Sequence, residues 1–320
     1  MISQKQKIAV LISGIILLIF GVRFLAESGI FTKDHSLVVR PSYIKTVSVA
    51  RASANKDGVH FGGELPEQQP WGPQGFTFDK NGDLWIADSV AHRAIKVDDN
   101  GEIMQVIDAS NVARTITYAV PGNDWIALLD ISNIPPKIHF YSYEGAFLAS
   151  TNIPEGWAGS VAGMSTDSSG DIFVEQSGGI NRYRISLDEK YQGTIERVAS
   201  LYSEQAPEGF TENGGAIQPI ESGFTIGSFH LLEIAKDGAT YWYSEEYRNN
   251  EDGTLSVNVV VRRFGKSGDL ERYMVIPFSD RYTFVDEQGI VIFPDEQEVW
   301  FMLTKKDGVE IKQLEWRKIY

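Results

Sequence analysis

Short apolar runs alternate with polar turns along most of the chain after residue 70, and the clearest example spans residues 75–108. There the runs GFTF, LWIAD, AIKVD and EIMQVID are separated by the segments DKNGD, SVAHR and DNG. Apolar runs of this length that meet at Gly-containing turns predict β-strands joined as hairpins. Residues 75–108 are therefore predicted to form a four-stranded antiparallel meander.

The same order of strands and turns recurs in later segments, which begin near Thr115, Met164, Leu232 and Ile290. The second strands of the five units are centred on Trp85, Trp125, Phe173, Trp242 and Trp300. The first two intervals, 40 and 48 residues, match the length of about 40–50 residues that is typical of a propeller blade. The longer intervals indicate insertions or one further blade within residues 203–229. Helical spacing of apolar residues is scarce after residue 33, which disfavours α/β folds.

The sequence therefore predicts an all-β fold, a β-propeller of about six blades, five of which can be delineated. A β-sandwich is the alternative. The last unit reaches the end of the chain after three strands, and propellers often close by borrowing a strand from the other terminus. The β-rich run SLVVRPSYIKTVSVA, residues 36–50, is the candidate for that strand, since closure hides sheet edges that promote aggregation.

The N-terminus has the pattern of an export segment. Lys5 and Lys7 precede an uncharged apolar run over residues 8–22, and Arg23 follows it. This pattern predicts either an uncleaved signal anchor, that is, a transmembrane helix, or a cleaved signal peptide. Basic residues before the run place the remainder of the chain on the extracytoplasmic side, membrane-anchored or secreted. The predicted domains are a signal segment at 1–33, a linker with the possible closing strand at 34–72, and the propeller at 73–320.

Composition narrows the classes of partner. The 320-residue chain has 29 Lys and Arg against 43 Asp and Glu, a formal net charge of -14. This charge repels a phosphate backbone and excludes nucleic acid as the expected partner. The absence of cysteine excludes disulfides, thiolate nucleophiles and Cys-ligated zinc. A protein, a peptide or a glycan outside the cytoplasm is the expected partner.

The stretch PQGFTFDKNGDLWIADSVAHRAIKVDDNG, residues 73–101, resembles an NHL repeat. The resemblance implies a six-bladed propeller of the broad NHL, strictosidine-synthase and gluconolactonase-like group, which contains scaffolds, receptors and enzymes. Gluconolactonase-like members hold a divalent ion with a Glu near the first blade and with later Asn and Asp residues. Glu67 precedes the first blade here but lacks the Glu-Gly-Pro setting of that group, and no matching Asn or Asp residues align. No catalytic residue, metal ligand or cofactor is therefore assigned, although a divalent cation in the channel belongs to the enzyme alternative.

Candidate chemistry is concentrated on the corner between the second and third strands of the first unit. Asp88, His92 and Arg93 could form a catalytic set, but the resemblance implies that they organise the corner. The segments DKNGD and DSSGD lack the ligand spacing of calcium loops and are interpreted as turns. The five histidines form no His-x-x-x-His pair, which disfavours zinc.

The corners of a propeller gather on one face around the channel, where ligands usually dock. The residues expected on that face are Trp71, Gln74, His92, Arg114, Trp157, His230, Arg281 and Tyr282. Aromatic, Arg and His side chains suit recognition of a protein, peptide or glycan. The sequence therefore predicts a membrane-tethered binding or assembly module for an envelope component. The alternative is a metal-dependent hydrolase or lyase of the gluconolactonase-like type, with its site in the central channel.

Overall fold

The protein is represented by a computed structural model that separates into two compact units, Met1–Val39 and Arg40–Tyr320. All described residues belong to the second unit, and they are residues 43–50, 58–63, 71–98, 100–153, 161–166, 171–176, 181–188, 191, 193–200, 218–277, 289–293, 296–305 and 307–318. Within these ranges no helix has the length and apolar character needed to cross a membrane. The predicted signal segment, Trp157, Arg281 and Tyr282 lie outside the described residues.

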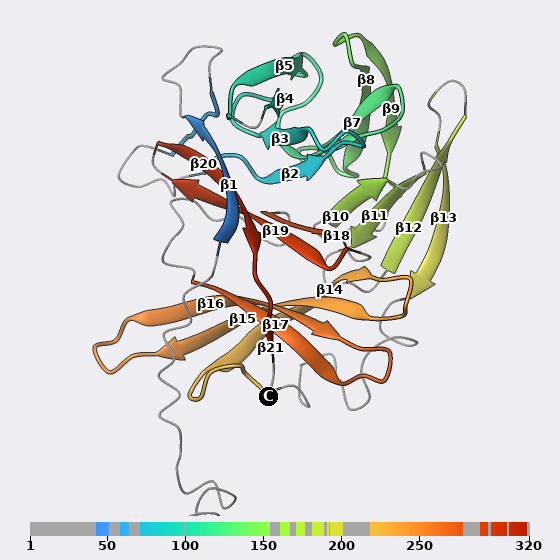
Figure 1. The fold of residues 1–320 in the computed structure, drawn as a ribbon. Coiled ribbons are helices and arrows are strands. Elements are labelled where there is room, and N and C mark those ends of the chain that lie inside the picture. The colour runs from blue at the N-terminus through green and yellow to red at the C-terminus, as the bar shows by residue number, and fades with distance from the viewer. Residues whose placement is uncertain are drawn as a thin grey trace, which may run out of the picture. The chain divides into compact units, whose positions relative to one another are not determined.

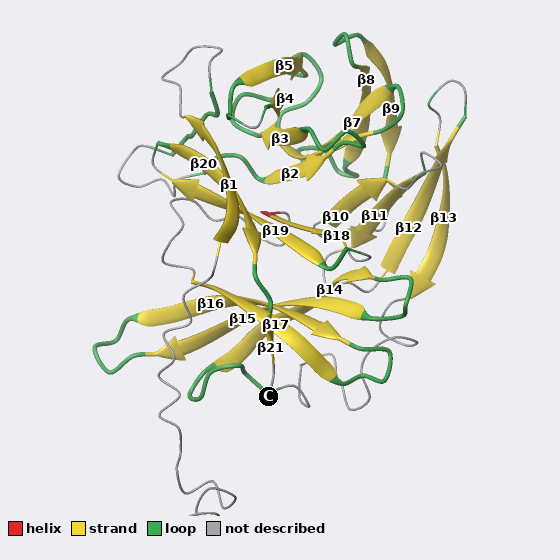
Figure 2. Ribbon diagram, viewed as in Figure 1, coloured by secondary structure: helices red, strands yellow, loops and turns green. Residues whose placement is uncertain are grey.

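The described residues form five antiparallel sheets, which we call blades 1 to 5 in chain order (Figure 1, Figure 2). Blade 1 comprises β2 (Gly75–Phe78), β3 (Leu84–Asp88), β4 (Arg93–Val97) and β5 (Ile103–Asp108). Blade 2 comprises β6 (Ile116–Pro121), β7 (Trp125–Asp130), β8 (Lys137–Ser142) and β9 (Phe147–Asn152). Blade 3 comprises β10 (Val161–Thr166), β11 (Ile172–Gln176), β12 (Asn181–Leu187) and β13 (Gly193–Ser200).

Blades 4 and 5 recruit strands from distant parts of the sequence. Blade 4 comprises β14 (Thr225–Ile234), β15 (Thr240–Asn249), β16 (Leu255–Phe264), β17 (Leu270–Pro277) and β21 (Arg317–Lys318). Blade 5 comprises β18 (Ile290–Phe293), β19 (Glu298–Lys305), β20 (Gly308–Leu314) and β1 (Tyr43–Ala50). The N-terminal strand thus completes the last blade, and the C-terminal strand extends the blade before it.

The central strands are buried on both faces, which explains why they read as continuous apolar runs. In β3, Leu84 and Ile86 pack with Met302 and Ile311 of blade 5. The alternate residue Trp85 packs with Leu128 of blade 2. Because side chains alternate across a strand, one such strand contributes to the core on both sides of its blade.

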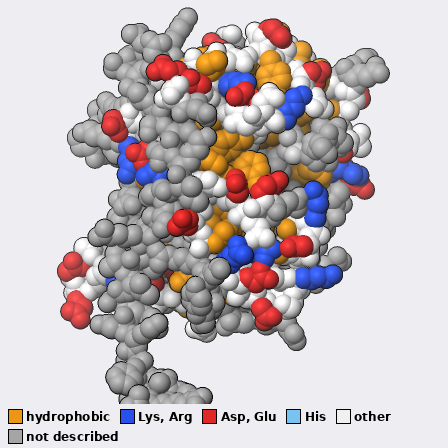
Figure 3. Space-filling view, in the orientation of Figure 1, with side chains coloured by type: hydrophobic (Ala, Val, Ile, Leu, Met, Phe, Trp, Pro, Cys, Tyr) orange, Lys and Arg blue, Asp and Glu red, His pale blue; other side chains and the backbone are white. Residues whose placement is uncertain are grey.

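Similar apolar clusters join blade 2 to blade 3 and blade 4 to blade 5. A cavity of about 110 Å³ is bordered by residues from the first strand of every blade, β2, β6, β10, β14 and β18. First strands that meet around one cavity, with the other strands outside them, are the arrangement of a β-propeller rather than a sandwich. Figure 3 shows apolar side chains near the middle of the face in view, among charged side chains of both signs.

The described residues form the five blades that the sequence delineates, and all five border the cavity. Part of the extra length between the third and fourth repeats is used by β14, which begins at Thr225. Residues 201–217 lie outside the described residues.

The ring is closed by backbone pairing between the two ends of the second unit. β1 pairs antiparallel with β20, with Val47 opposite Ile311 and Ala50 opposite Gly308. β1 lies within residues 36–50, the run from which the sequence predicts a closing strand. This strand covers an edge of blade 5 that would otherwise present unpaired backbone groups.

Candidate binding face at the blade corners

Blades 1, 2 and 4 each bury an acid at or near the end of the second strand, at Asp88, Asp130 and Glu246. Each acid accepts hydrogen bonds from backbone N–H groups of the segment that precedes the first strand of its blade. Each also lies beside a basic side chain of the third strand. A buried carboxylate is stable when hydrogen bonds use its lone pairs, as the backbone N–H donors do here.

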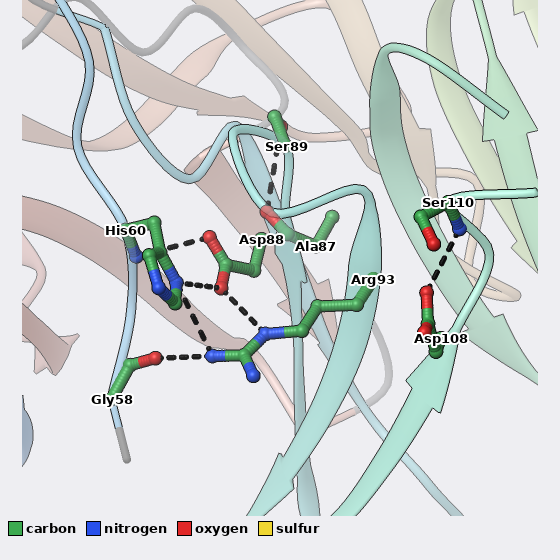
Figure 4. Close-up of polar contacts among 8 residues, drawn as sticks. All are labelled: Gly58, His60, Ala87, Asp88, Ser89, Arg93, Asp108 and Ser110. Atoms are coloured by element: carbon green, nitrogen blue, oxygen red, sulfur yellow. Dashed lines mark hydrogen bonds and ion pairs between the residues drawn. The ribbon is translucent and has the colours of Figure 1, made fainter. Parts of the chain in front are cut away.

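In blade 1, Asp88 lies between His60 and Arg93 (Figure 4). Asp88 Oδ1 accepts the His60 backbone N–H at 3.1 Å, and Oδ2 contacts His60 Nδ1 at 3.0 Å and Arg93 Nε at 2.9 Å. The Arg93 guanidinium also donates to the Gly58 carbonyl oxygen. These contacts tie residues 58–60 to the corner, so Asp88 and Arg93 act in the architecture of the blade.

His92 does not join this network as the third member of a catalytic set. Its backbone has φ of 53°, and its carbonyl oxygen accepts the Ala109 N–H at 3.0 Å. Its Nδ1 atom is buried and has no hydrogen-bond partner among the described residues. The histidine that contacts Asp88 is His60, which sequence reasoning missed because it precedes Asp88 by 28 residues in a segment without a strand pattern.

In blade 2, a single carboxylate fixes two neighbouring loops. Asp130 accepts hydrogen bonds from the backbone N–H groups of Arg114, Thr115 and Ser132 and from Asn133 Nδ2. Its Oδ2 atom also lies 3.6 Å from His139 Nε2. Burial raises the pKa of Asp130, but His139 and the backbone N–H donors outweigh that effect and hold the pKa well below its usual range. The loops at residues 109–115 and 131–136 are therefore held by the ionised form of Asp130.

We expect Asp130→Asn to lower the free energy of unfolding by about 2–3 kcal/mol at pH 7, because hydrogen bonds to a charged acceptor are lost. The pKa of Asp130 is lower in the folded state, so its stabilisation is complete above the unfolded value of about 4 and declines as the pH falls below it. The difference between wild type and Asp130→Asn, measured by urea unfolding, should therefore shrink between pH 5 and pH 3. A difference that is constant over this range would show that the charge of Asp130 contributes nothing.

In blade 4, the acid and its basic partner are both fully buried. Glu246 forms an ion pair with Arg262 and accepts the Ile220 backbone N–H, at 3.0 Å from Oε2. Arg262 also donates to the Ser244 hydroxyl. Burial raises the pKa of Glu246 in spite of Arg262, and burial lowers the pKa of Arg262. Neither charge would be tolerated here without the other.

The two loops that Asp130 fixes present apolar side chains to solvent. Val112 is 40% exposed, Ile131 is 39% exposed and Ile134 is 98% exposed. The Ile131 N–H donates to the Thr115 carbonyl oxygen at 3.1 Å, which holds the loops side by side. Arg114 is exposed on the same loop as Val112. We call Val112, Arg114, Ile131 and Ile134 the corner patch.

The other residues predicted for the binding face have varied surroundings. Trp71 is exposed, and its backbone pairs with Gly62. The Gln74 side-chain amide donates to the Gly72 carbonyl oxygen at 3.1 Å. The backbone of His230 lies in β14 opposite Tyr243, and its side chain is outside the described atoms. Of the predicted set, Arg114 is exposed on a loop that also exposes Val112 and is hydrogen-bonded to the loop of Ile131.

The central cavity is lined mainly by apolar side chains, with polar groups from Thr77, Ser165 and Glu233. Glu233 is the one acid among the described lining residues. In the described ranges, His, Asp and Glu side chains form no group of three or more that could hold a metal ion. A gluconolactonase-like site would need several carboxylate or amide oxygens directed at one point.

Among known proteins, only solved structures are similar to this chain. No protein-family model matches the chain. No curated protein matches it either. A streptogramin B lyase structure is 13% identical, covers 84% of this chain and 97% of its own, and has a TM-score of 0.43. A protein from Bacteroides fragilis that is proposed to be exported is 12% identical, with coverages of 89% and 98% and a TM-score of 0.40.

A protein that is proposed to be a gluconolactonase is also similar, at 11% identity, with coverages of 78% and 76% and a TM-score of 0.38. The propeller assignment rests on this chain's own sheets and their pairing. Five antiparallel sheets, with their first strands around one cavity, identify the fold as a β-propeller.

Proposed function

We propose that this protein is a membrane-tethered, extracytoplasmic β-propeller that binds a partner protein or peptide through the corner patch. The observation that carries the proposal is that exposed aliphatic side chains lie on loops fixed by hydrogen bonds to Asp130. Ile134 is almost fully exposed, and the buried Asp130 holds both loops that form the patch. Apolar side chains presented on a preorganised backbone lose little entropy on binding, which raises affinity.

The chemistry of the patch favours a protein or peptide over a glycan. Its members are two isoleucines, one valine and one arginine, and aliphatic side chains bind apolar side chains of a partner. Arg114 adds a positive charge on a chain whose net charge is -14. We therefore infer a partner segment that has an apolar side chain beside a carboxylate.

The three buried acids at the second strands of blades 1, 2 and 4 favour a binding function over catalysis. Asp88, Asp130 and Glu246 accept backbone N–H groups and lie beside basic side chains, so their lone pairs and charges are used by the fold. The proposed tether is the N-terminal segment, in which Lys5 and Lys7 precede the uncharged run at residues 8–22. By the positive-inside rule, this order supports a propeller outside the cytoplasm.

Site-specific photo-crosslinking in intact cells tests the proposal. A photoreactive residue at position 134 should crosslink one discrete partner, and the adduct should be lost when Arg114→Glu reverses the neighbouring charge. Met104, which is exposed on the outer strand of blade 1, is the matched control position and should give no such adduct. Absence of a discrete adduct at position 134, or the same adduct at position 104, would overturn the proposal.

A further inference from the structure

The hairpin between β15 and β16 is longer than the corresponding hairpins of the other blades. Both strands have ten residues, whereas β3 and β4 of blade 1 have five each. Within the described residues, β14 pairs with β15 no further than Tyr247, and β17 pairs with β16 no further than Asn258. Residues 248–257 therefore extend beyond the neighbouring strands as a two-stranded hairpin. We call this hairpin, with Tyr247 at its base, the arm (Figure 1).

Hydrogen bonds make the arm well ordered. The Asn250 N–H donates to the Thr254 carbonyl oxygen at 2.8 Å, and the Gly253 N–H donates to the Asn250 carbonyl oxygen at 3.0 Å. Asp252 Oδ1 accepts the Thr254 N–H at 2.9 Å. Gly253 has φ of 81°, a conformation that glycine adopts without strain. The tip is thus a tight turn in which the backbone N–H groups of Asn250, Gly253 and Thr254 donate hydrogen bonds.

One face of the arm carries three large apolar side chains, with Asn249 beside them and Glu245 nearer the sheet. Tyr247 is opposite Val257 in the ladder, and Leu255 is two residues from Val257, so the three side chains share a face. Leu255 is 57% exposed and Tyr247 is 36% exposed. Further along the same face, Tyr243, Val259 and Val261 are buried against blade 5. The face that packs against blade 5 near the sheet therefore continues along the arm, where it is exposed.

The aromatic ring on this face is held in place. A Cβ atom at Gly227 would lie 3.1 Å from two carbons of the Tyr247 ring, so the ring rests on the backbone of β14. On the opposite face of the arm, the Arg248 guanidinium lies 4.7 Å from the centroid of the Phe224 ring. Tyrosine fixed in this way is a favourable contact residue, because little side-chain entropy is lost on binding.

The negative charge at the tip of the arm favours a partner with cationic side chains. Glu251 and Asp252 are exposed at the tip, and hydrogen bonds from Thr254 lower the pKa of Asp252. The one cation of the arm, Arg248, contacts Phe224 on the other face. One cationic side chain of a partner could contact the two tip carboxylates, and another could contact the Tyr247 ring at the base of the arm. An anionic membrane surface would be repelled by the same carboxylates.

We propose that the arm is a second docking surface, which binds a segment of another protein that carries apolar side chains and Lys or Arg. It differs from the corner patch, where Arg114 favours an acidic partner. The arm therefore enables the propeller to hold two partners of opposite charge. This inference goes beyond the proposed function and does not depend on it.

Binding of defined peptides to the purified full-length protein tests the arm. The probe is a fluorescent twelve-residue peptide of alternating Leu and Arg, and its binding is followed by fluorescence anisotropy. Leu–Ser and Ser–Arg peptides are the comparisons, because each lacks one of the two side-chain types. We expect the Leu–Arg peptide to bind at least about tenfold more tightly than either comparison, with affinity that falls as salt is raised. Leu255→Ser and Glu251→Lys should each weaken binding at least about fivefold, a loss of about 1 kcal/mol.

Met104→Ser, which also removes an exposed apolar side chain, is the matched control and should bind like the wild type. Both arm variants should keep the wild-type unfolding midpoint, since the two replaced side chains are exposed. Equal binding by Leu255→Ser and wild type, or equal binding of the Leu–Ser peptide, would overturn the proposal. Self-association or vesicle binding that Leu255→Ser abolishes would also overturn it, because the arm would then bind a second copy or a membrane.

Discussion

Arg262→Ala is expected to lower the free energy of unfolding by about 3–5 kcal/mol, the range found when one partner of a buried ion pair is removed. Arg262 and Glu246 are both fully buried, and Glu246 also fixes the Ile220 backbone. Without Arg262 the carboxylate must be buried as an uncompensated charge or take up a proton. Urea unfolding followed by tryptophan fluorescence measures the change.

Two further variants make this prediction specific. Glu246→Gln combined with Arg262→Met removes both charges, and it should recover more than half of the stability lost by Arg262→Ala. Arg184→Ala breaks a more exposed ion pair with Glu196, and it should cost less than about 1 kcal/mol. A loss of under about 1 kcal/mol for Arg262→Ala would show that the buried pair does not hold blade 4 together.

Removal of β1 is the second change with a large expected effect. β1 pairs with β20 at six positions, and each backbone hydrogen bond contributes about 1 kcal/mol on average. A chain that begins at Arg51 should therefore lose several kcal/mol and expose the edge of β20, compared with a chain that begins at Arg40. Thermal unfolding should show a midpoint lower by more than about 10 °C, and the shortened chain should aggregate more readily.

The missing strand can be supplied separately. A synthetic peptide of residues 40–50 should raise the midpoint of the shortened chain, whereas a scrambled peptide of the same composition should not. Equal midpoints for the chains that begin at Arg40 and Arg51 would contradict a structural role for β1.

The strands were predictable because their determinants are local. In blade 1 the apolar runs and the glycines of the turns determine the strand positions, and β2 and β3 occupy the runs GFTF and LWIAD. Gly82 and Gly101 have φ of 84° and 85° at the two turns, a conformation that favours glycine. The propeller fold followed from repetition of this local pattern.

The candidate site was not predictable in this way, because it depends on contacts between distant residues. The link between His60 and Asp88 spans 28 residues, and nothing in the sequence around His60 indicates it. The exposure of Ile134 depends on how the loop at residues 131–136 packs on Asp130. Apolar residues in a loop are equally compatible with burial beneath a neighbouring blade.

The proposal of a binding module is tested most directly by the affinity for the partner that is crosslinked at position 134. Wild type, Ile134→Ser and Met104→Ser should be compared by isothermal titration calorimetry with that purified partner. Loss of a buried isoleucine at the centre of the contact should weaken binding at least about tenfold, a change of about 1.4 kcal/mol, with Met104→Ser unchanged. Equal affinities of Ile134→Ser and wild type would contradict the account.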